Sequence, residues 1–141
     1  MRHIFIGTTD IASQISEFKR GFESLGHKVF TAIMIPHTFM VQGKYDTVVY
    51  DAVPRSLKNT RTPGLRLVRR LLLDRARKRL LNYAIKHCDT FVFIWSSFFN
   101  NRRDFRLLRA LKKKLWWLLW GMIFAGFPLW NKSFALMDFL L

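Results

Sequence analysis

The chain has 141 residues, with 24 Lys or Arg, 9 Asp or Glu, a formal net charge of +15 and 50% hydrophobic residues. This length fits one domain of ordinary size and excludes two. A single cysteine, Cys88, excludes a paired disulfide framework, and the four histidines are too scattered to indicate a zinc cluster. We therefore expect a reducing, cytoplasmic setting and no bound metal.

The positive charge is concentrated in the middle of the chain. Residues 55–114 hold 18 Lys or Arg against three Asp, whereas cations and anions balance in the remainder. After Leu115 the only charged residues are Lys132 and Asp138, and four of the five Trp lie in this segment. Any functional interpretation has to account for both the basic middle and the apolar carboxyl-terminal segment.

The amino-terminal residues have the pattern of a Rossmann-like unit. The run from His3 to Ile6, closed by Gly7, predicts a buried strand and is shorter than the about 7–15 apolar residues of a signal peptide. Apolar residues then recur at spacings of four and three from Ile11 onward, which predicts a helix. Thr9 or Asp10 is expected to cap its start and Gly26 to end it; this order is typical of the opening of a Rossmann-like unit.

Three further segments continue the alternation. Residues 28–35 predict a second strand, ended by Pro36 because proline cannot donate into a sheet, and residues 45–50 predict a short strand near the sheet edge. Residues 54–64 are polar and contain two prolines, so we expect a loop there.

The second half predicts two helices around a central strand. The longer helix runs from about residue 65 to 87, and its leucine side is expected to face the sheet. That side comprises Leu65, Val68, Leu72, Ala76, Leu80 and Ala84. Residues 89–95 form an unbroken apolar run, which suits a central parallel strand. Residues 101–114 predict a helix with Phe105, Leu108 and Leu111 inward and Asp104 supporting its start. The sequence therefore predicts a single α/β domain, a Rossmann-like parallel sheet with flanking helices.

The turn Gly7-Thr8-Thr9-Asp10 is the first candidate site. Backbone N–H groups at the start of a helix favour phosphate or another anion. The turn lacks the second and third glycines of a dinucleotide fingerprint, so it does not indicate NAD or FAD. The alternative is structural: Gly7 makes a tight turn and Thr9 or Asp10 caps the helix.

The second candidate site follows the second and fourth predicted strands. Trp95, Ser96 and Ser97 end the predicted strand 89–95 and could present an indole and two hydroxyls to a sugar or another polar acceptor; the alternative is a buried Trp and a loop. His37 follows the second predicted strand and is a candidate base, or else a solvated loop histidine. Cys88 has no neighbouring pattern of cations that marks a reactive thiolate, so we interpret it as a small core residue.

Several of these segments resemble the amino-terminal domain of bacterial GT-B glycosyltransferases, enzymes built from two Rossmann-like domains. The resemblance rests on the Gly-Thr-x-Asp-Ile-Ala turn, on Leu25-Gly26-His27 at the helix end, and on the strand at 89–95 followed by Ser96-Ser97-Phe98. It covers residues 1–114. Leu-Gly-His at this place is shared by many such enzymes and names no substrate.

The resemblance implies an acceptor-binding domain that acts in envelope polysaccharide or lipid-linked glycan synthesis. In that architecture a second domain holds most of the nucleotide-sugar donor, and no such domain follows in this chain. By analogy, Gly7, Thr8 and Thr9 would lie near the donor phosphates. The chain is then expected to be inactive alone and to bind no cofactor tightly, a nucleotide sugar being the donor of full-length relatives.

The apolar segment 115–141 has two interpretations. Read in a shifted frame with permitted codons, it gives a strand, a Gly-Asp-Asp turn and a polar continuation, which suggests a frameshifted and truncated gene. The rival interpretation is a membrane segment, although the uncharged run of residues 115–130 is shorter than the about 20 residues needed to span a bilayer. An interfacial segment beside Lys112–Lys114 remains the alternative.

The basic middle also leaves alternatives open. We expect a membrane-surface patch on the long helix, because clustered Lys and Arg attract anionic lipid. The patch comprises Arg66, Arg69, Arg70, Arg75, Arg77, Lys78 and Arg79. RNA binding would use the same charges, but no exposed aromatic platform accompanies them. A solvated helix face is the structural alternative. We therefore expect a peripheral protein at the inner face of the plasma membrane, or else a small basic non-enzymatic membrane-associated protein.

Overall fold

A computed structural model describes residues 1–10, 13–36, 44–99 and 103–118. Its centre is a five-stranded sheet in the order β3-β2-β1-β4-β5, and every neighbouring pair is parallel. The strands are β1 (His3–Thr8), β2 (Lys28–Ile33), β3 (Thr47–Val48), β4 (Thr90–Ile94) and β5 (Lys114–Leu118). The fold is therefore α/β with a Rossmann-like parallel sheet, which confirms the predicted fold class.

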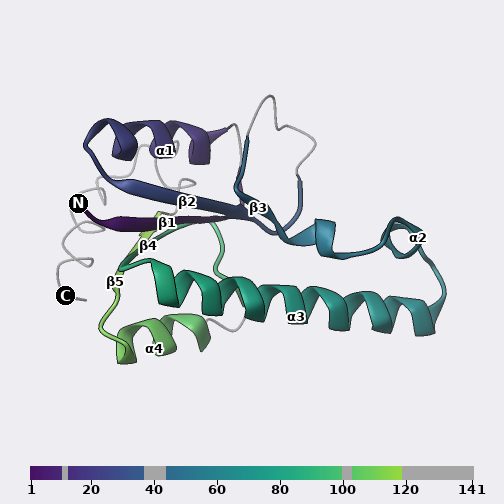
Figure 1. Ribbon diagram of the computed structural model, residues 1–141. Helices are drawn as coiled ribbons and strands as arrows, with labels where there is room; N and C mark the ends of the chain where they lie inside the picture. Colours follow the sequence, from purple (N-terminus) through teal and green to yellow (C-terminus); the bar gives the residue numbers. More distant parts are fainter. Residues whose placement is uncertain (11–12, 37–43, 100–102, 119–141) are drawn as a thin grey trace, which may run out of the picture.

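Helices cover both faces of the sheet (Figure 1). Helix α1 (Gln14–Ser24) lies on one face, and α3 (Pro63–His87) and α4 (Arg103–Ala110) lie on the other. A 3₁₀ helix η1 (Val49–Ala52) and a short helix α2 (Arg55–Lys58) connect β3 to α3. The short helix α2 corrects our expectation of a loop throughout residues 54–64.

The two faces of the sheet carry separate apolar cores. Ile4, Ile6 and Val92 point to the α1 side, where Ile15 of α1 is buried against them. Phe5 and its neighbours point to the α3 and α4 side. That second core comprises Phe5, Ala32, Val49, Leu80, Leu81, Ala84, Cys88, Phe91, Phe93, Phe98 and Leu108. The unbroken apolar runs of β1 and β4 follow from this arrangement, because alternate side chains enter opposite cores.

The predicted strands are confirmed with changed limits. β1 extends through Gly7 to Thr8, so Gly7 lies inside a strand and does not form the turn that we expected. The third strand is short and lies at the sheet edge, as expected. β5 continues the sheet parallel to β4 across Lys114 and Leu115, and Leu115 packs against the core on the α3 side. The sheet thus includes the first residues of the apolar segment.

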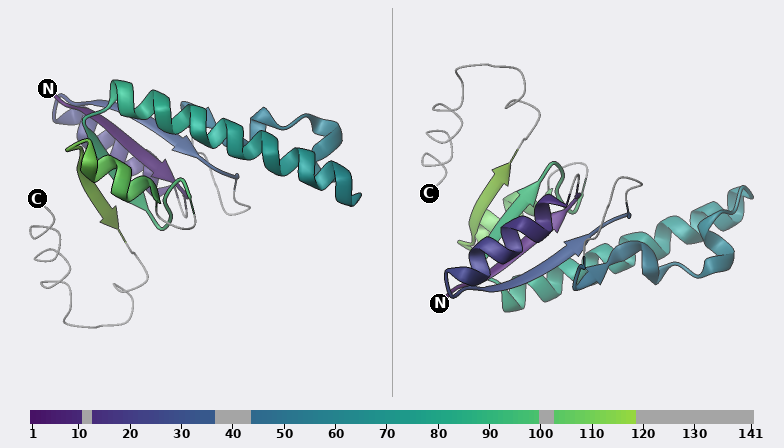
Figure 2. Two further views of the ribbon diagram at one scale, coloured as in Figure 1. Left: turned by 90° about the horizontal axis from the view of Figure 1, so that it is seen from below. Right: turned by 90° about the horizontal axis from the view of Figure 1, so that it is seen from above.

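Helix α3 extends far beyond the sheet (Figures 1 and 2). Only Leu80, Leu81 and Ala84 of this 25-residue helix are buried. Leu65 and Val68 are exposed, which contradicts the prediction that they face the sheet. Leu111, expected to point inward, is also exposed and lies just beyond the end of α4.

Candidate functional site

Two predicted candidate loops meet at the carboxyl-end edge of the sheet. β1 and β4 are neighbours, and Thr8 pairs with Ile94 at the last position of their register. Thr9 and Ser96 therefore leave the sheet side by side. The carboxyl ends of parallel strands are where α/β proteins collect ligands. Among the predicted residues, Thr8, Thr9 and Ser96 are brought into direct contact.

Their three hydroxyls form a continuous chain. Thr8 Oγ1 lies 2.7 Å from the Ser96 carbonyl oxygen and 2.9 Å from Ser96 Oγ. Ser96 Oγ lies 2.5 Å from Thr9 Oγ1. Thr8 is fully buried, whereas Thr9 and Ser96 are half-buried. The chain thus begins in the core of the sheet and ends at Thr9, toward the surface.

Counting protons fixes the direction of this chain. A carbonyl oxygen only accepts, so Thr8 donates its one hydroxyl proton to the Ser96 carbonyl. Ser96 must then donate its proton to Thr8 Oγ1, and Thr9 must donate its proton to Ser96 Oγ. The Thr9 oxygen is left with its acceptor lone pairs and no proton to offer. This end of the chain suits a ligand that donates a hydrogen bond, such as a sugar hydroxyl.

Ser97, which follows Ser96, has a different hydrogen-bond partner. Ser97 Oγ donates to the Phe99 carbonyl at 2.8 Å, so its proton is used within the loop after β4. The Ser97 carbonyl lies 3.3 Å from Thr8 Oγ1 and is a second, longer acceptor for the same buried hydroxyl. Ser97 therefore supports the loop that positions Ser96.

Asp10 is bound on both sides by the protein itself. Its Oδ1 accepts from the Ile15 N–H at 3.2 Å, so Asp10 binds a first-turn N–H of α1 as expected, although the N-cap position itself is Ser13. Its Oδ2 accepts from the Tyr45 hydroxyl at 2.5 Å. Burial, together with the Asp10 carboxylate, raises the pKa of Tyr45 above its usual range. Asp10 thus ties β1 to α1 and to the segment before β3.

Tyr45 is the residue of this region that the sequence analysis did not single out. It was assigned only to the edge of a short strand, and no spacing relates it to Asp10, which lies 35 positions away. A lone tyrosine in the sequence carries no signal of such a contact. Only the tertiary arrangement brings the pair together.

Trp95 takes an unusual backbone conformation directly before Ser96. Its φ of 65° lies in the left-handed region, which a bulky side chain seldom adopts. The Ser96 N–H donates to the Ile94 carbonyl at 2.8 Å across this turn. The indole packs partly against the α1-side core, and its buried Nε1 has no hydrogen-bond partner among the residues that the structure describes. The turn at Trp95 directs Ser96 back toward Thr8 and Thr9.

The basic patch belongs to α3, and His37 is outside the described residues. Within the patch, Arg69 Nη1 donates to the Lys58 carbonyl at 2.9 Å, and Arg77 is half-buried and paired with Asp74 at 3.4 Å. The other five members are exposed, namely Arg66, Arg70, Arg75, Lys78 and Arg79. Five of the seven predicted cations are therefore open to a ligand.

Comparison with known proteins adds no family. No protein-family model matches the chain, and neither the curated proteins nor the solved structures give a match. Across residues 1–10, 13–36, 44–99 and 103–118, no three His, Cys, Asp or Glu side chains are grouped as a metal site would need. In the same ranges, no helix has the length and apolar character to cross a bilayer.

Proposed function

We propose that this chain is the acceptor-side domain of a nucleotide-sugar-dependent glycosyltransferase of GT-B architecture, acting in envelope polysaccharide or lipid-linked glycan synthesis. The single observation that carries the proposal is the hydroxyl chain, whose proton order leaves Thr9 as a hydrogen-bond acceptor at the carboxyl-end edge of the sheet. A neutral sugar donates such hydrogen bonds, whereas a fully ionised phosphate does not. The Rossmann-like parallel sheet supports the same proposal.

The proposal assigns the residues as follows. Thr9 accepts a hydrogen bond from an acceptor-glycan hydroxyl, Ser96 orients Thr9, and Thr8 anchors Ser96 to the sheet. Transfer itself needs a donor domain with the nucleotide sugar, so we propose that the chain alone binds glycan without turnover. Its place would be cytoplasmic, peripheral at the inner face of the plasma membrane.

Chemical-shift titration tests this function. Isotope-labelled protein is titrated with cellobiose and chitobiose as neutral glycan probes, and with inorganic diphosphate as the anionic probe. We expect the amides of Thr9 and Ser96 to shift with at least one disaccharide. Thr9→Ala is expected to weaken that binding about tenfold, the effect of one lost hydrogen bond, whereas Thr9→Ser retains it.

The matched control is Ser24→Ala. Ser24 donates only to the Gly21 carbonyl on the exposed end of α1, so its removal leaves the titration unchanged. Shifts at Thr9 and Ser96 with diphosphate alone, or equal disaccharide binding by Thr9→Ala and wild type, would overturn the proposal.

A second function is favoured by one different observation. The projecting part of α3 exposes Leu67 and Leu71 among its cations, as a non-enzymatic membrane-associated protein would. Under this alternative the disaccharides cause no shift at Thr9 or Ser96, while lipid vesicles still bind the protein. The two experiments therefore separate the two functions.

A further inference from the structure

The projecting part of α3 exposes leucines that no described element covers. We define the α3 arm as residues 63–79, the part of α3 that precedes its first buried residue, Leu80. Leu67 is 59% exposed and Leu71 is 60% exposed. They are four residues apart and so lie on one face of the helix. Two large neighbouring apolar side chains that stay this exposed are candidates for a contact surface.

Cations lie beside these two leucines and beyond them along the helix. Along the same helical row, Arg75 follows Leu71 by four residues and Lys78 follows Arg75 by three. On the adjacent face, Arg66 and Arg70 stand at the level of the leucines. We call these four exposed side chains the cation ring: Arg66, Arg70, Arg75 and Lys78. Helix α3 carries eight Lys or Arg and only one Asp, so the surroundings are strongly positive.

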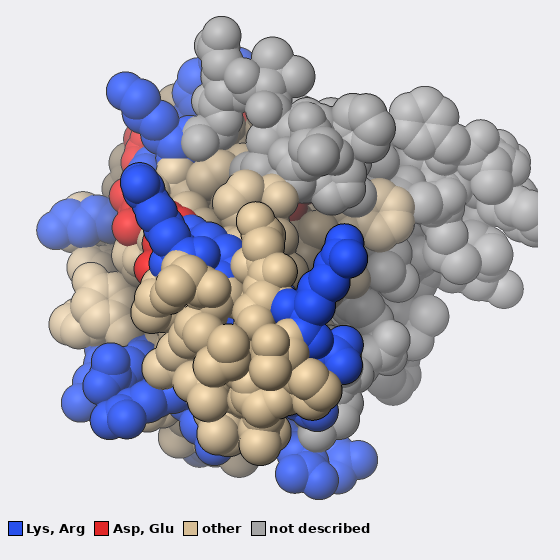
Figure 3. All heavy atoms as spheres, turned by 90° about the vertical axis from the view of Figure 1, so that its right-hand side faces the viewer, with Lys and Arg blue, Asp and Glu red and all other residues tan. Residues whose placement is uncertain are grey.

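The surface at this end of the molecule has the same character. Seen from the side where the arm projects, Lys and Arg surround a centre of other residues, and acidic side chains gather only toward one margin (Figure 3). The other side of the arm is held by the connection before it, since Arg69 donates to the Lys58 carbonyl. The arm is therefore supported from within while its leucine row remains free.

We propose that the α3 arm docks on an anionic lipid bilayer, with Leu67 and Leu71 inserted below the lipid phosphates and the cation ring bound to them. This inference deepens the membrane location included in the proposed function. The free energy falls when apolar side chains move from water to the boundary between headgroups and acyl chains. Lys and Arg at the same depth keep their charged ends at the headgroups, because their long stems reach outward. Insertion is thus shallow.

Lipid fits this surface better than nucleic acid does. Both ligands would satisfy the cations, but single-stranded nucleic acid is bound by aromatic side chains that stack on its bases. The exposed apolar side chains between these cations are aliphatic, namely Leu67, Val68 and Leu71, and they neither stack on bases nor contact phosphates favourably. The acyl region of a bilayer is the environment that matches them.

Vesicle sedimentation tests the leucine part of the proposal. We expect wild type to bind vesicles of phosphatidylcholine with about one third phosphatidylglycerol, and to bind pure phosphatidylcholine at least tenfold more weakly. Leu67→Ala/Leu71→Ala is expected to lose about tenfold in affinity for the anionic vesicles. The matched control is Leu107→Ala/Leu111→Ala, a second exposed pair four residues apart at α4, which leaves binding unchanged.

A charge variant tests the cation ring separately. Arg75→Gln/Lys78→Gln is expected to weaken binding to anionic vesicles about tenfold, at about 1 kcal/mol for each cation near the surface. Arg106→Gln/Arg109→Gln removes two exposed charges from α4 and serves as its control. An equal loss of vesicle affinity in the two double variants would overturn the proposed docking face.

A site-specific label distinguishes the arm from the rest of the chain. Leu71→Cys can be labelled with an environment-sensitive fluorophore, because the native Cys88 is buried. Anionic vesicles are expected to shift the emission to the blue and spin-labelled lipids to quench it; the same label at Leu107→Cys stays unchanged. An unresponsive label at position 71, or a response to single-stranded RNA with none to vesicles, would overturn the proposal. Vesicle binding is measured without glycan, so a failed glycan titration leaves its outcome intact.

Discussion

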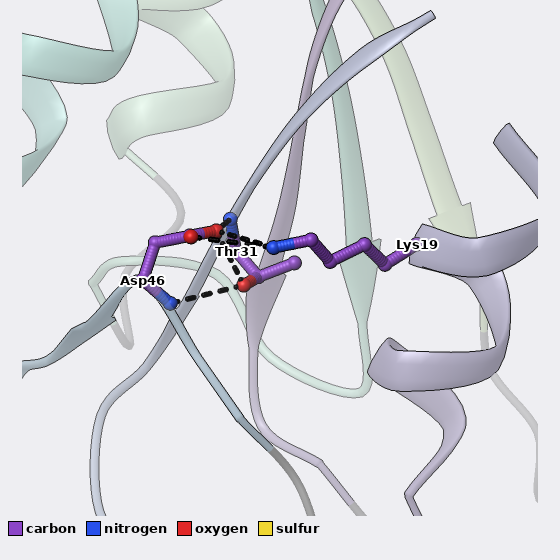
Figure 4. A network of polar contacts seen from close by, with 3 residues as sticks. All are labelled: Lys19, Thr31 and Asp46. Carbon is purple, nitrogen blue, oxygen red and sulfur yellow. Dashed lines mark hydrogen bonds and ion pairs between the residues drawn. The ribbon is translucent and has the colours of Figure 1, made fainter. Parts of the chain in front are cut away.

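Asp46 and Thr31 bind each other through three hydrogen bonds at the edge of the sheet (Figure 4). Asp46 Oδ2 accepts from the Thr31 N–H and hydroxyl, both at 2.8 Å, and the Asp46 N–H donates back to Thr31 Oγ1 at 3.2 Å. Lys19 of α1 adds an ion pair at 3.1 Å. One carboxylate thereby joins a helix, strand β2 and the start of the two-residue edge strand β3.

Asp46→Asn is expected to lower the free energy of unfolding by about 1 kcal/mol at pH 7. Buried hydrogen bonds to a charged group stabilise a protein by somewhat more than this, but the Asp46 carboxylate is partly exposed to solvent, which reduces the effect. Urea denaturation measures the change. Asp51→Asn is the control, because Asp51 is mostly exposed and, among the described residues, is bound to Lys58 alone. A loss for Asp51→Asn equal to that for Asp46→Asn would contradict the assigned role.

The difference in free energy of unfolding between wild type and Asp46→Asn depends on pH through the pKa of Asp46. Burial acts to raise this pKa, but the Thr31 hydrogen bonds and Lys19 outweigh burial and hold it below its usual range. The stabilisation is therefore fully present above the unfolded value of about 3.9 and is lost as the pH falls through the folded pKa. We expect the advantage of wild type over Asp46→Asn to be constant above about pH 5 and to shrink in acid. An advantage that grows in acid would refute this assignment.

Asp104 is expected to show the opposite dependence. Burial raises the pKa of this carboxyl, although the Phe98 N–H that donates to its Oδ2 at 2.8 Å acts the other way. The contribution of Asp104 to the free energy of unfolding is then largest below the pKa of the carboxyl in the unfolded chain, and it declines as the pH rises through the pKa in the folded protein. Asp104→Asn keeps an acceptor for Phe98 without a buried charge, so its stability relative to wild type should increase from pH 4 to pH 8. Thermal unfolding across that range measures it.

Asp104→Ala separates the hydrogen bond from the charge. This variant leaves the buried Phe98 N–H without the Asp104 acceptor, and we expect a loss of about 1–3 kcal/mol at every pH. If Asp104→Asn and Asp104→Ala are equally destabilised at pH 7, the carboxylate itself rather than its acceptor oxygen supports the start of α4.

The order of β1, α1, β2, β3, α3, β4 and α4 was predictable because each of these elements has a local signature, whereas α2 and β5 were not predicted. β1 and β4 are continuous apolar runs, and α1 shows apolar residues at helical spacing before Gly26, whose φ of 78° ends the helix as expected. The exposure of the α3 leucines was not predictable in this way. Twenty-five helical residues extend about 37 Å, whereas the five residues of β4 extend about 17 Å. Periodicity identifies an apolar face but not the length of sheet beneath it.

The candidate site was predictable only in part. The rule that ligands collect at the carboxyl ends of parallel strands selected Thr9 and Ser96, which the structure brings into contact. The order of protons among their hydroxyls depends on distances, and the contact of Asp10 with Tyr45 joins residues that no pattern relates. Local sequence therefore located the edge, while tertiary packing determined its chemistry.

Cys88 is expected to resist modification until the protein unfolds. Its side chain is buried, and burial together with the neighbouring Asp89 raises the pKa of the thiol to about 11, although Lys113 acts in the opposite direction. At pH 8 the thiolate fraction is then small, and the thiol is also inaccessible. A disulfide reagent should react slowly with native protein and rapidly in denaturant. Rapid stoichiometric reaction of the folded protein would contradict this assignment.

Gly7→Ala is expected to destabilise the protein by about 2–3 kcal/mol through overpacking in the centre of the sheet. A Cβ at position 7 would lie 2.6 Å from the Ala32 carbonyl oxygen and 2.9 Å from the Phe5 ring. The carbonyl belongs to the neighbouring strand β2 and cannot move without disturbing the sheet. Gly21→Ala is the matched control: nothing lies within 4 Å of a Cβ there, and alanine favours helix α1 by about 0.5–1 kcal/mol. Urea denaturation should therefore show a lower free energy of unfolding for Gly7→Ala and a higher one for Gly21→Ala. A Gly7→Ala protein as stable as wild type would show that β1 and β2 approach less closely than the structure places them.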